Sequence, residues 1–393
     1  MPSLFDGRRL WFAGIGGAGM SGYASLARAW GAEVRGWDRV RTPYLDHLEG
    51  IDIEITAEPP PPPDGWEPIV STAFAGLVEG KSRAEFLQEL VGLRDALVVA
   101  GAHGKTTTTA MIAFCLQRLG RDPAYLVGGE VPQLGGNAAA GGGWLVVEGD
   151  ESDRTIERLR PKIAVLTNVD LDHHSTFASR AEVEDLFEGW LEHVPLVVRG
   201  EELLPYEGEL AVPGLHNRRN AACALAALEL VGIDRGEAER VLAEFGGVGR
   251  RLEWRGNVGG IEVVDDYAHN PAKIAATLEA LRDERRLVVL FQPHLFSRTR
   301  HLALALAKAL AAADVVAVTD VYPAREQPIE GVTGKLVVDA LAEVRPGMEL
   351  AWTPTVEQGA AFLAATARHG DRLVTIGAGD VDRAAALVLE ALA

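Results

Sequence analysis

The sequence predicts an α/β protein of three domains, each built around a mainly parallel sheet. Short apolar runs of strand length alternate with helix-length segments from one end of the chain to the other, as expected for such layers. The alternation restarts three times, and 393 residues exceed what one ordinary hydrophobic core accommodates. We therefore expect domains at residues 1–89, 90–248 and 249–393, of which the first and third are Rossmann-like.

Composition excludes several classes of protein. Hydrophobic residues make up 48% of the chain and charged residues 24%, as in soluble globular proteins. A formal net charge of −18 repels nucleic acid phosphates, so we expect no nucleic-acid partner. Charges interrupt every apolar stretch before it reaches membrane-spanning length, and the N-terminus lacks a signal-peptide core, so we expect a cytoplasmic protein without a membrane partner. Cys115 and Cys223 are predicted to be reduced thiols in the core.

The first domain carries a glycine-rich turn. A strand is expected at residues 9–13, a helix ending at Trp30, and a second strand ending at Asp38. Between strand and helix stand Gly14, Gly16, Gly17, Ala18 and Gly19, which satisfy G-x-G-x-x-G. Such glycines permit a tight turn and close phosphate approach, and an acid at the next strand end can bind a ribose hydroxyl. The pattern fits NAD, a nucleotide-sugar diphosphate or merely a tight turn.

Two segments are predicted to be loops. The five prolines at 59–63 cannot form regular structure and are expected to form an extended surface loop. Residues 128–143 are rich in glycine and are expected to form a mobile loop. A charged segment at 82–93 is predicted to be the helix that leads into the central domain.

The central domain opens with a predicted phosphate-binding loop. Residues 97–109 read L-V-V-A-G-A-H-G-K-T-T-T-T, an apolar strand that runs into glycines and a helix start. Lys105 is expected to reach the β- and γ-phosphates of ATP, and Thr106 to offer a hydroxyl to Mg²⁺. Val99 replaces the first glycine of the usual loop, which departs from the simple match and makes the loop tighter, with Gly101 as its first glycine. The strand, loop and helix together predict a central domain of P-loop ATPase type. The expected nucleotide contacts along it are Gly101, Ala102, His103, Gly104, Lys105, Thr106 and Thr107.

Polar residues follow two further strands of this domain. Glu148 ends one apolar strand and is predicted to bind metal, whereas Asp150, Glu151 and Asp153 fit either that site or a solvated acidic face. His173 follows another strand and is either an ordinary loop histidine or a second metal ligand. Because the carboxyl ends of parallel strands meet at one edge of a sheet, these residues are expected to converge on Lys105.

Helix-like segments at 217–231 and 235–245 close the central domain. Asn217 is either an adenine contact or a helix N-cap, and Arg251 is either a phosphoryl-stabilising arginine or a surface residue.

The third domain repeats the alternation, with strands expected at 261–265, 287–291, 315–319 and 372–376. Its first strand ends in adjacent carboxylates, Asp265 and Asp266, which need polar or positive partners. Pro271 is expected to begin a helix.

Taken together, the motifs resemble the Mur ligase family, the ATP-dependent amide-forming enzymes of peptidoglycan precursor synthesis. The resemblance spans nearly the whole chain and rests on nine ordered segments: 14–22, 101–109, 148–153, 167–173, 216–220, 247–251, 265–271, 291–294 and 377–379. It implies that the chain joins L-alanine to the carboxylate of UDP-N-acetylmuramate through an acyl phosphate. The implied cofactors are ATP and Mg²⁺, and we expect a monomer or a weak homodimer.

The resemblance also implies roles for individual residues. Lys105 and Thr106 serve the ATP phosphates and Mg²⁺, and Glu148 and His173 bind metal. Asn217 and Asn220 approach adenine. The remaining implied contacts are Arg251 with the γ-phosphate, Asp266 with the nucleotide, His269 and Arg298 with the acceptor, and the first-domain glycines, Asp38, Ser71 and Asn137 with the sugar nucleotide.

The chain departs from the family pattern in places. Leu295 stands where family members commonly carry arginine, and Ala102 replaces the usual threonine of the loop. Within the family, a recycling ligase that adds a whole peptide is the rival, and the residue pattern at 17–19 and 291–294 favours the single-alanine enzyme. From other classes, an NAD-dependent dehydrogenase explains Gly14 to Asp38 but leaves Lys105 without a role, and a plain P-loop ATPase leaves the first domain without one.

Overall fold

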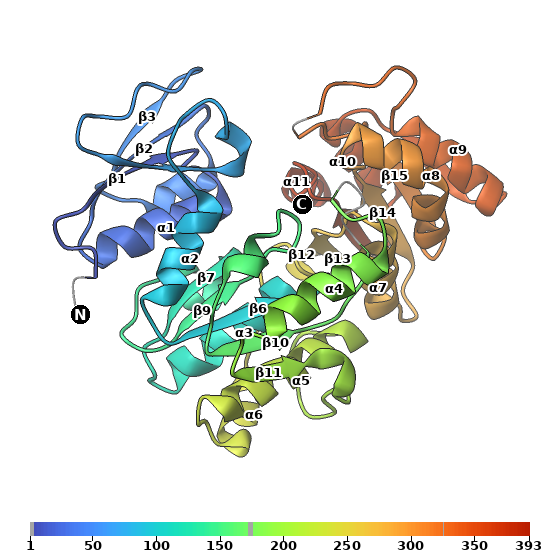
Figure 1. Cartoon of the computed structure of the whole chain (residues 1–393). Helices are drawn as coiled ribbons and strands as arrows, with labels where there is room; N and C mark the ends of the chain where they lie inside the picture. Colours follow the sequence, from blue (N-terminus) through green and yellow to red (C-terminus); the bar gives the residue numbers. More distant parts are fainter. Residues whose placement is uncertain (1–3, 172–175, 325) are drawn as a thin grey trace. The chain divides into compact units, whose positions relative to one another are not determined.

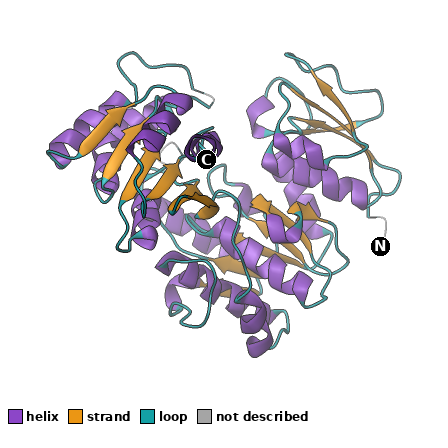
Figure 2. Cartoon of the chain, turned by 180° about the vertical axis from the view of Figure 1, so that it is seen from behind, coloured by secondary structure: helices purple, strands orange, loops and turns teal. Residues whose placement is uncertain are grey.

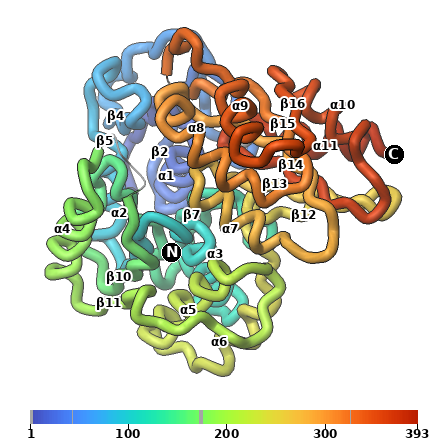
Figure 3. The backbone as a smooth tube through the Cα atoms, turned by 90° about the vertical axis from the view of Figure 1, so that its right-hand side faces the viewer, coloured from blue at the N-terminus to red at the C-terminus, as the bar shows by residue number. Residues whose placement is uncertain are grey.

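The computed structural model describes residues 4–171, 176–324 and 326–393, whose strands form three sheets (Figure 1). The chain divides into two compact units. The first comprises Met1–Ala211 and His216–Val248, and the second comprises Val212–Leu215 and Gly249–Ala393. Figure 3 traces the same succession of segments by residue number. The predicted α/β class is confirmed.

The first sheet is parallel, and apolar residues pack on both of its faces. Its strands, in spatial order, are β3 (Asp52–Ile55), β2 (Glu33–Asp38), β1 (Arg9–Ala13), β4 (Glu67–Val70) and β5 (Lys81–Ser82). Helices α1 (Ala18–Ala29) and α2 (Arg83–Gly92) share a core with Leu10 and Phe12 of β1. Alternate side chains of a strand point to opposite faces, so Trp11 packs on the other side with Trp37 and Phe74. Short 3₁₀ helices lie at η1 (Pro43–His47) and η2 (Thr72–Phe74).

The second sheet has one antiparallel pair at its edge. Its order is β11 (Leu196–Arg199), β10 (Ile163–Leu166), β6 (Ala96–Ala100), β9 (Leu145–Glu148), β7 (Ala124–Val131) and β8 (Gly136–Ala139), with β7 and β8 antiparallel. The accompanying helices are α3 (Lys105–Arg118), α4 (Arg180–Leu191), α5 (Leu215–Leu230), α6 (Arg235–Leu242), η3 (Pro132–Leu134), η4 (Thr155–Arg158) and η5 (Gly200–Glu202). The mobile loop predicted at 128–143 is wrong, because this segment forms the β7–β8 pair and Gly135, at φ 77°, serves its turn.

Helix α1 joins the first sheet to the second. It packs against β7 and β8, and a Cβ at Gly22 would lie 2.9 Å from Leu126 Cδ2. The absence of a side chain at this position therefore permits the close approach of the helix to β7. One continuous core runs from Phe5 to Val194 and includes residues of both sheets.

The third sheet makes up the second unit and is covered on both faces (Figure 2). Its order is β12 (Glu253–Val258), β13 (Ile261–Asp266), β17 (Arg372–Ile376), β14 (Leu287–Phe291), β15 (Val315–Val318) and β16 (Glu349–Trp352), with β12 antiparallel to β13. Helices α7 (Pro271–Leu281), α8 (Phe296–Leu310) and α9 (Lys335–Val344) pack on one face, and α10 (Val356–Thr366) and α11 (Arg383–Leu392) on the other. Helix α7 begins at Pro271 as predicted, and Asn270 Oδ1 caps it by accepting from Lys273 N at 2.9 Å.

Both cysteines are buried and free, as predicted. Burial raises the pKa of the Cys115 thiol to about 12 and that of Cys223 to about 11. Across the described ranges, helices of the length and apolarity needed to cross a bilayer are absent.

Candidate active site

The predicted phosphate-binding loop joins β6 to α3 and depends on two glycines. Gly101 has φ 125° and Gly104 has φ 83°, a left-handed conformation that side chains disfavour. A Cβ at Gly101 would lie 2.3 Å from Thr167 Oγ1, and one at Gly104 would lie 2.2 Å from Asn220 Oδ1. The loop therefore passes where side chains do not fit, and it presents the amino end of α3, where backbone N–H groups favour anions.

Thr167 and Asn168, which follow β10, hold this loop in place through hydrogen bonds. Asn168 O accepts from Ala102 N at 3.2 Å, and its Oδ1 accepts from His103 N at 3.0 Å. The His103 carbonyl accepts from Asn168 Nδ2 at 2.8 Å and from Thr167 Oγ1 at 2.6 Å. His103 Nε2 lies 3.3 Å from Asp170 Oδ2. Sequence analysis included segment 167–173 among the family motifs but did not reveal that Thr167 and Asn168 hold the loop.

Lys105, the first residue of α3, forms a buried ion pair. Its Nζ donates to Glu151 Oε1 at 2.9 Å, to Glu151 Oε2 at 2.8 Å and to Gly101 O at 2.6 Å. The side chain of Lys105 is 17% exposed and that of Glu151 is 2% exposed. Burial lowers the pKa of Lys105, but the charges of Glu151, Asp150 and Glu148 more than offset it, so the pKa is raised above its ordinary value. The ammonium therefore remains charged at neutral pH.

Thr106 and Glu148 place hard oxygen donors side by side. Thr106 Oγ1 donates to Glu148 Oε2 at 3.1 Å, and Glu148 Oε1 accepts from Gly128 N. Hydroxyl and carboxylate oxygens are ligands that Mg²⁺ prefers, so this pair fits the predicted metal. His173 lies outside the described residues, and within those residues three or more His, Cys, Asp or Glu side chains do not gather into a metal site. Convergence of Glu148 on Lys105 is confirmed, because β9 pairs with β6.

The acidic run after β9 is not a solvated face. Arg83, the first residue of α2, contacts Asp153 at 2.6 Å and Asp150 at 3.4 Å. Together with Lys105 on Glu151, these contacts give three of the acidic residues positively charged partners. Sequence reasoning missed Arg83, because a single arginine at a helix start carries no distinguishing signal.

Two asparagines of α5 lie against the loop. Helix α5 begins at Leu215, so Asn217 lies inside its first turn and the alternative that Asn217 is the N-cap is wrong. Asn217 and Asn220 are 5% and 6% exposed, and Asn220 faces Gly104. Thr107, also predicted to contact nucleotide, is buried in the first turn of α3.

The glycine-rich turn of the first sheet is held by Asp38. Asp38 Oδ2 accepts from Gly16 N and Oδ1 accepts from Arg39 N, both at 2.7 Å. At Gly14, where φ is 82°, a Cβ would lie 2.4 Å from Ser71 Oγ. The predicted residues Gly14, Gly16, Asp38 and Ser71 therefore gather at the carboxyl ends of β1, β2 and β4.

Asn137 lies near the same turn although it belongs to the second sheet. Its Nδ2 donates to Ala18 O, in the first turn of α1, at 2.8 Å. Gly17 immediately precedes this helix and Gly19 lies in its first turn. Asn137 also lines a pocket of about 330 Å³ with Ser21 and residues of η1, whereas the other predicted sugar-nucleotide contacts do not line it.

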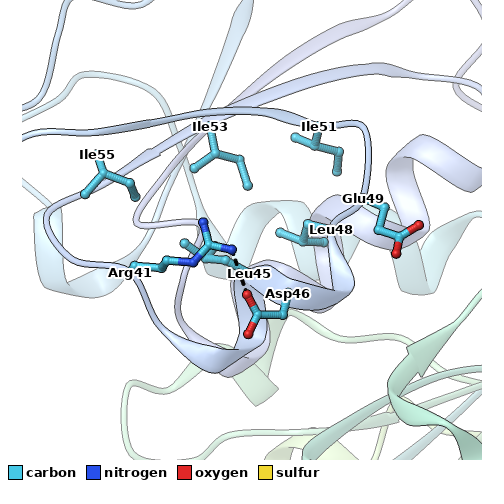
Figure 4. A pocket seen from close by; sticks show the side chains of 8 residues that line it. All are labelled: Arg41, Leu45, Asp46, Leu48, Glu49, Ile51, Ile53 and Ile55. Carbon is cyan, nitrogen blue, oxygen red and sulfur yellow. Dashed lines mark hydrogen bonds and ion pairs between the residues drawn. The ribbon is translucent and has the colours of Figure 1, made fainter.

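A second pocket lies on the edge strand β3 (Figure 4). Ile51, Ile53 and Ile55 form one side of it, and Arg41 pairs with Asp46 at 2.7 Å beside them. The residues predicted as functional do not line this pocket.

In the second unit, an aromatic row follows the carboxyl ends of β13, β14 and β15. The ring centroids of Tyr267 and His269 are 5.5 Å apart, those of His269 and His294 5.8 Å, and those of His294 and Tyr322 5.9 Å. Tyr322 N donates to Pro293 O at 2.8 Å, which joins the loops after β14 and β15. His269 was predicted on the acceptor side, and the other rings of the row were not singled out individually.

Two arginines that were predicted to be functional belong to the same unit. Arg298 lies in the first turn of α8, directly after Leu295, whose φ of 72° is unusual for a residue with a side chain. Arg251 lies over Tyr267, with its guanidinium carbon 5.0 Å from the ring centroid.

The two aspartates that end β13 meet polar partners. Asp265 is fully buried, and burial raises its pKa to about 6 despite the neighbouring Arg250. Asp266 Oδ2 accepts from Leu252 N at 2.8 Å, and Oδ1 accepts from Thr277 Oγ1 at 2.9 Å. The carboxylate of Asp266 therefore fixes the start of this unit, and its predicted nucleotide contact stays a prediction.

Comparison with known proteins gives matches along the whole chain. The model of the Mur ligase middle domain matches residues 99–199, and that of the Mur ligase glutamate ligase domain matches residues 250–379. A UDP-N-acetylmuramate–L-alanine ligase of Renibacterium salmoninarum is 37% identical over 457 residues, covering 99% of this chain and 97% of that protein. The ligase of the same name from Rubrobacter xylanophilus is 38% identical over 433 residues, covering 94% and 97%.

A solved structure gives the same result. The UDP-N-acetylmuramate–alanine ligase of Thermotoga maritima aligns with a TM-score of 0.80 at 26% identity, over 97% of this chain and 98% of that chain. The fold is therefore shared over nearly the full length of both chains.

Proposed function

The chain belongs to the Mur ligase family, and on that premise we propose that it joins L-alanine to the carboxylate of UDP-N-acetylmuramate while ATP is converted to ADP and phosphate. The observation that carries this proposal is the full-length similarity to relatives that bear the name of that activity. The phosphate-binding loop and Lys105 supply the part of the site that such a reaction needs most.

The reaction has two steps. A carboxylate is a poor acyl donor, so an oxygen of the muramate carboxylate first attacks the γ-phosphorus of ATP, and the bond to ADP breaks. The amine of alanine then attacks the carbonyl carbon of the acyl phosphate and loses a proton, and phosphate leaves. The first step brings two anions together, so positive charge must surround the transferring group.

Residues of both units take part in this proposal. Lys105 donates to the β- and γ-phosphates, the amino end of α3 binds the phosphates, and Asn217 and Asn220 approach adenine. The sugar nucleotide lies at the glycine-rich turn with Asp38, Ser71 and Asn137. Arg251 meets the γ-phosphate, Asp266 the nucleotide, and His269 and Arg298 the acceptor.

Thr106 and Glu148 are the residues that would hold Mg²⁺, with His173 as a third ligand. When bound, the ion supplies Lewis-acid neutralisation of phosphate charge. We assign the sugar nucleotide to residues 1–89, ATP to residues 90–248 and the amino acid to residues 249–393. The protein acts as a monomer or a weak homodimer in the cytoplasm.

The test is phosphate release measured with each substrate omitted in turn. Release is expected to require ATP, Mg²⁺, UDP-N-acetylmuramate and L-alanine together, and Lys105→Ala is expected to abolish it without unfolding the protein. Steady release without the sugar nucleotide would refute the ligase and favour a plain ATPase. Replacing L-alanine with other amino acids and with an L-alanine-containing peptide distinguishes the single-alanine enzyme from a peptide-recycling ligase.

A further inference from the structure

The ammonium of Lys105 has no N–H group to spare. A lysine ammonium carries three donors, and its Nζ has three acceptors within 2.9 Å. One is the carbonyl of Gly101, in the same loop, and the other two are the carboxylate oxygens of Glu151. A phosphate oxygen that takes a hydrogen bond from Lys105 must therefore replace one of these three acceptors.

Lys105 cannot lose both hydrogen bonds to Glu151 when a phosphate binds. The carboxylate is 2% exposed, and removing the partner of a buried charge is strongly destabilising. A carboxylate has two oxygens, so Lys105 can give up one of them to a phosphate and keep the other. The lowest-cost exchange therefore leaves Lys105 attached to Glu151 while nucleotide is bound.

The backbone around Glu151 is itself held in place. Arg83 binds the flanking carboxylates Asp150 and Asp153, and Ser152 O accepts from Thr176 Oγ1 at 2.8 Å. Asp153 Oδ1 also accepts from Thr155 N at 3.1 Å. The backbone that carries Glu151 is thus held in place, whereas a lysine side chain is a flexible four-carbon stem with many rotamers.

We propose that Glu151 is the positioning residue for Lys105, and that it holds the ammonium where the transferring phosphoryl group requires it. Glu151 acts through Lys105 and does not itself touch the reacting atoms. The alternative is an ion pair that stabilises the fold and contributes nothing to the reaction. The expected changes in kcat and KM rest on the proposed function, whereas the expected change in ATP affinity requires only that the protein binds ATP.

The experiment compares Glu151→Gln and Glu151→Asp with the control Glu157→Gln. Glu157 lies nearby on η4, and its carboxylate is exposed and paired with Arg154 at 2.9 Å, so its substitution removes the same charge from the surface. Dissociation constants for ATP and AMP are measured by calorimetry in Mg²⁺, and kcat and KM by phosphate release. Thermal unfolding verifies that each variant is folded.

Glu151→Gln is expected to weaken ATP binding about tenfold and to leave AMP binding unchanged, because Lys105 serves phosphates that AMP lacks. Its kcat is expected to fall about 100-fold, as for a misplacement of about 1 Å. Glu151→Asp keeps the charge but withdraws the carboxylate by one methylene, so it is expected to recover kcat only in part. Glu157→Gln is expected to match the unmodified protein.

Unchanged or tighter ATP binding by Glu151→Gln would overturn the proposal, as would equal weakening of ATP and AMP binding. Full recovery of kcat by Glu151→Asp would also overturn it, because charge and not position would then suffice. If Glu151→Gln does not fold, Glu151→Asp decides through its ATP and AMP dissociation constants. If the unmodified protein fails to use L-alanine, the proposed function fails, and the two dissociation constants still test Glu151.

Discussion

Replacing Gly104 with alanine tests whether the phosphate-binding loop needs glycine for two separate reasons. The residue has φ 83°, and a Cβ there would lie 2.2 Å from Asn220 Oδ1. Gly120, just beyond the other end of α3, has φ 69°, and a Cβ there meets none of the described atoms within 4 Å. Gly120→Ala therefore imposes the backbone cost alone, and Gly104→Ala adds the steric conflict.

The expected magnitudes follow from these two geometries. A left-handed backbone costs an alanine about 1–2 kcal/mol, which is the expected loss for Gly120→Ala. Overpacking against a buried side chain adds about 1–3 kcal/mol, so Gly104→Ala is expected to lose about 2–5 kcal/mol. Asn220 is 6% exposed and has little room to retreat.

The assay is urea unfolding of both variants and the unmodified chain, followed by ATP binding at a urea concentration where all three are folded. We expect Gly104→Ala to unfold at clearly lower urea than Gly120→Ala and to lose ATP binding, because a displaced Asn220 distorts the loop. Equal midpoints for the two variants would refute the steric part of the reasoning. Unimpaired ATP binding by a folded Gly104→Ala protein would refute the functional part.

Three further predictions concern pH, loop bracing and metal. Burial raises the pKa of Asp265 from its ordinary value of 3.8 to about 6, so its folded form binds a proton more tightly than its unfolded form, and its stability contribution rises as pH falls from about 7 to about 4. The rise in the free energy of unfolding is at most about 3 kcal/mol. Thermal unfolding is therefore expected to show that Asp265→Asn becomes more stable relative to the unmodified protein as pH increases over that range. A difference in stability that stays constant with pH would contradict this. Thr167→Val removes a hydrogen bond to the His103 carbonyl, so it is expected to lower the free energy of urea unfolding by about 1 kcal/mol and to weaken ATP binding. Unchanged ATP affinity would show that this hydrogen bond does not contribute to the nucleotide site. Glu148→Gln is expected to raise the Mg²⁺ concentration for half-maximal phosphate release more than tenfold, and an unchanged Mg²⁺ requirement would remove Glu148 from the metal site.

The candidate site was predictable where neighbours in sequence create it. The strand, glycines and helix start at 97–109 lie together in the chain, so the loop could be recognised from the sequence. The approach of Glu148 followed from the rule that strand ends meet at one edge. The partner of Lys105 could not be found this way, because Glu151 lies 46 residues away within a run of similar acids.

The fold was predictable for buried strands and less so for edges. Strands β6 and β14 are continuous apolar runs, and each was expected within one residue of its bounds. The edge strands β3 and β16 carry mixed polar sequences, because one side of an edge strand lacks a neighbour and tolerates charge. The glycines of β7 and β8 misled the prediction, since glycine favours loops when the sheet that holds it is unknown.

The continuous core from Phe5 to Val194 has a consequence for how the protein can be divided. Residues 1–89 are proposed to bind their own substrate, yet the core on the helical face of their sheet continues into the second sheet, because α1 packs against β7 and β8. A fragment cut after residue 89 would carry its helices with one apolar side facing water. The segment that binds one substrate and the segment that folds as one unit thus end at different residues in this chain. Fragments or chimeras that exchange the sugar-nucleotide region should be cut at the end of the larger unit, near residue 248.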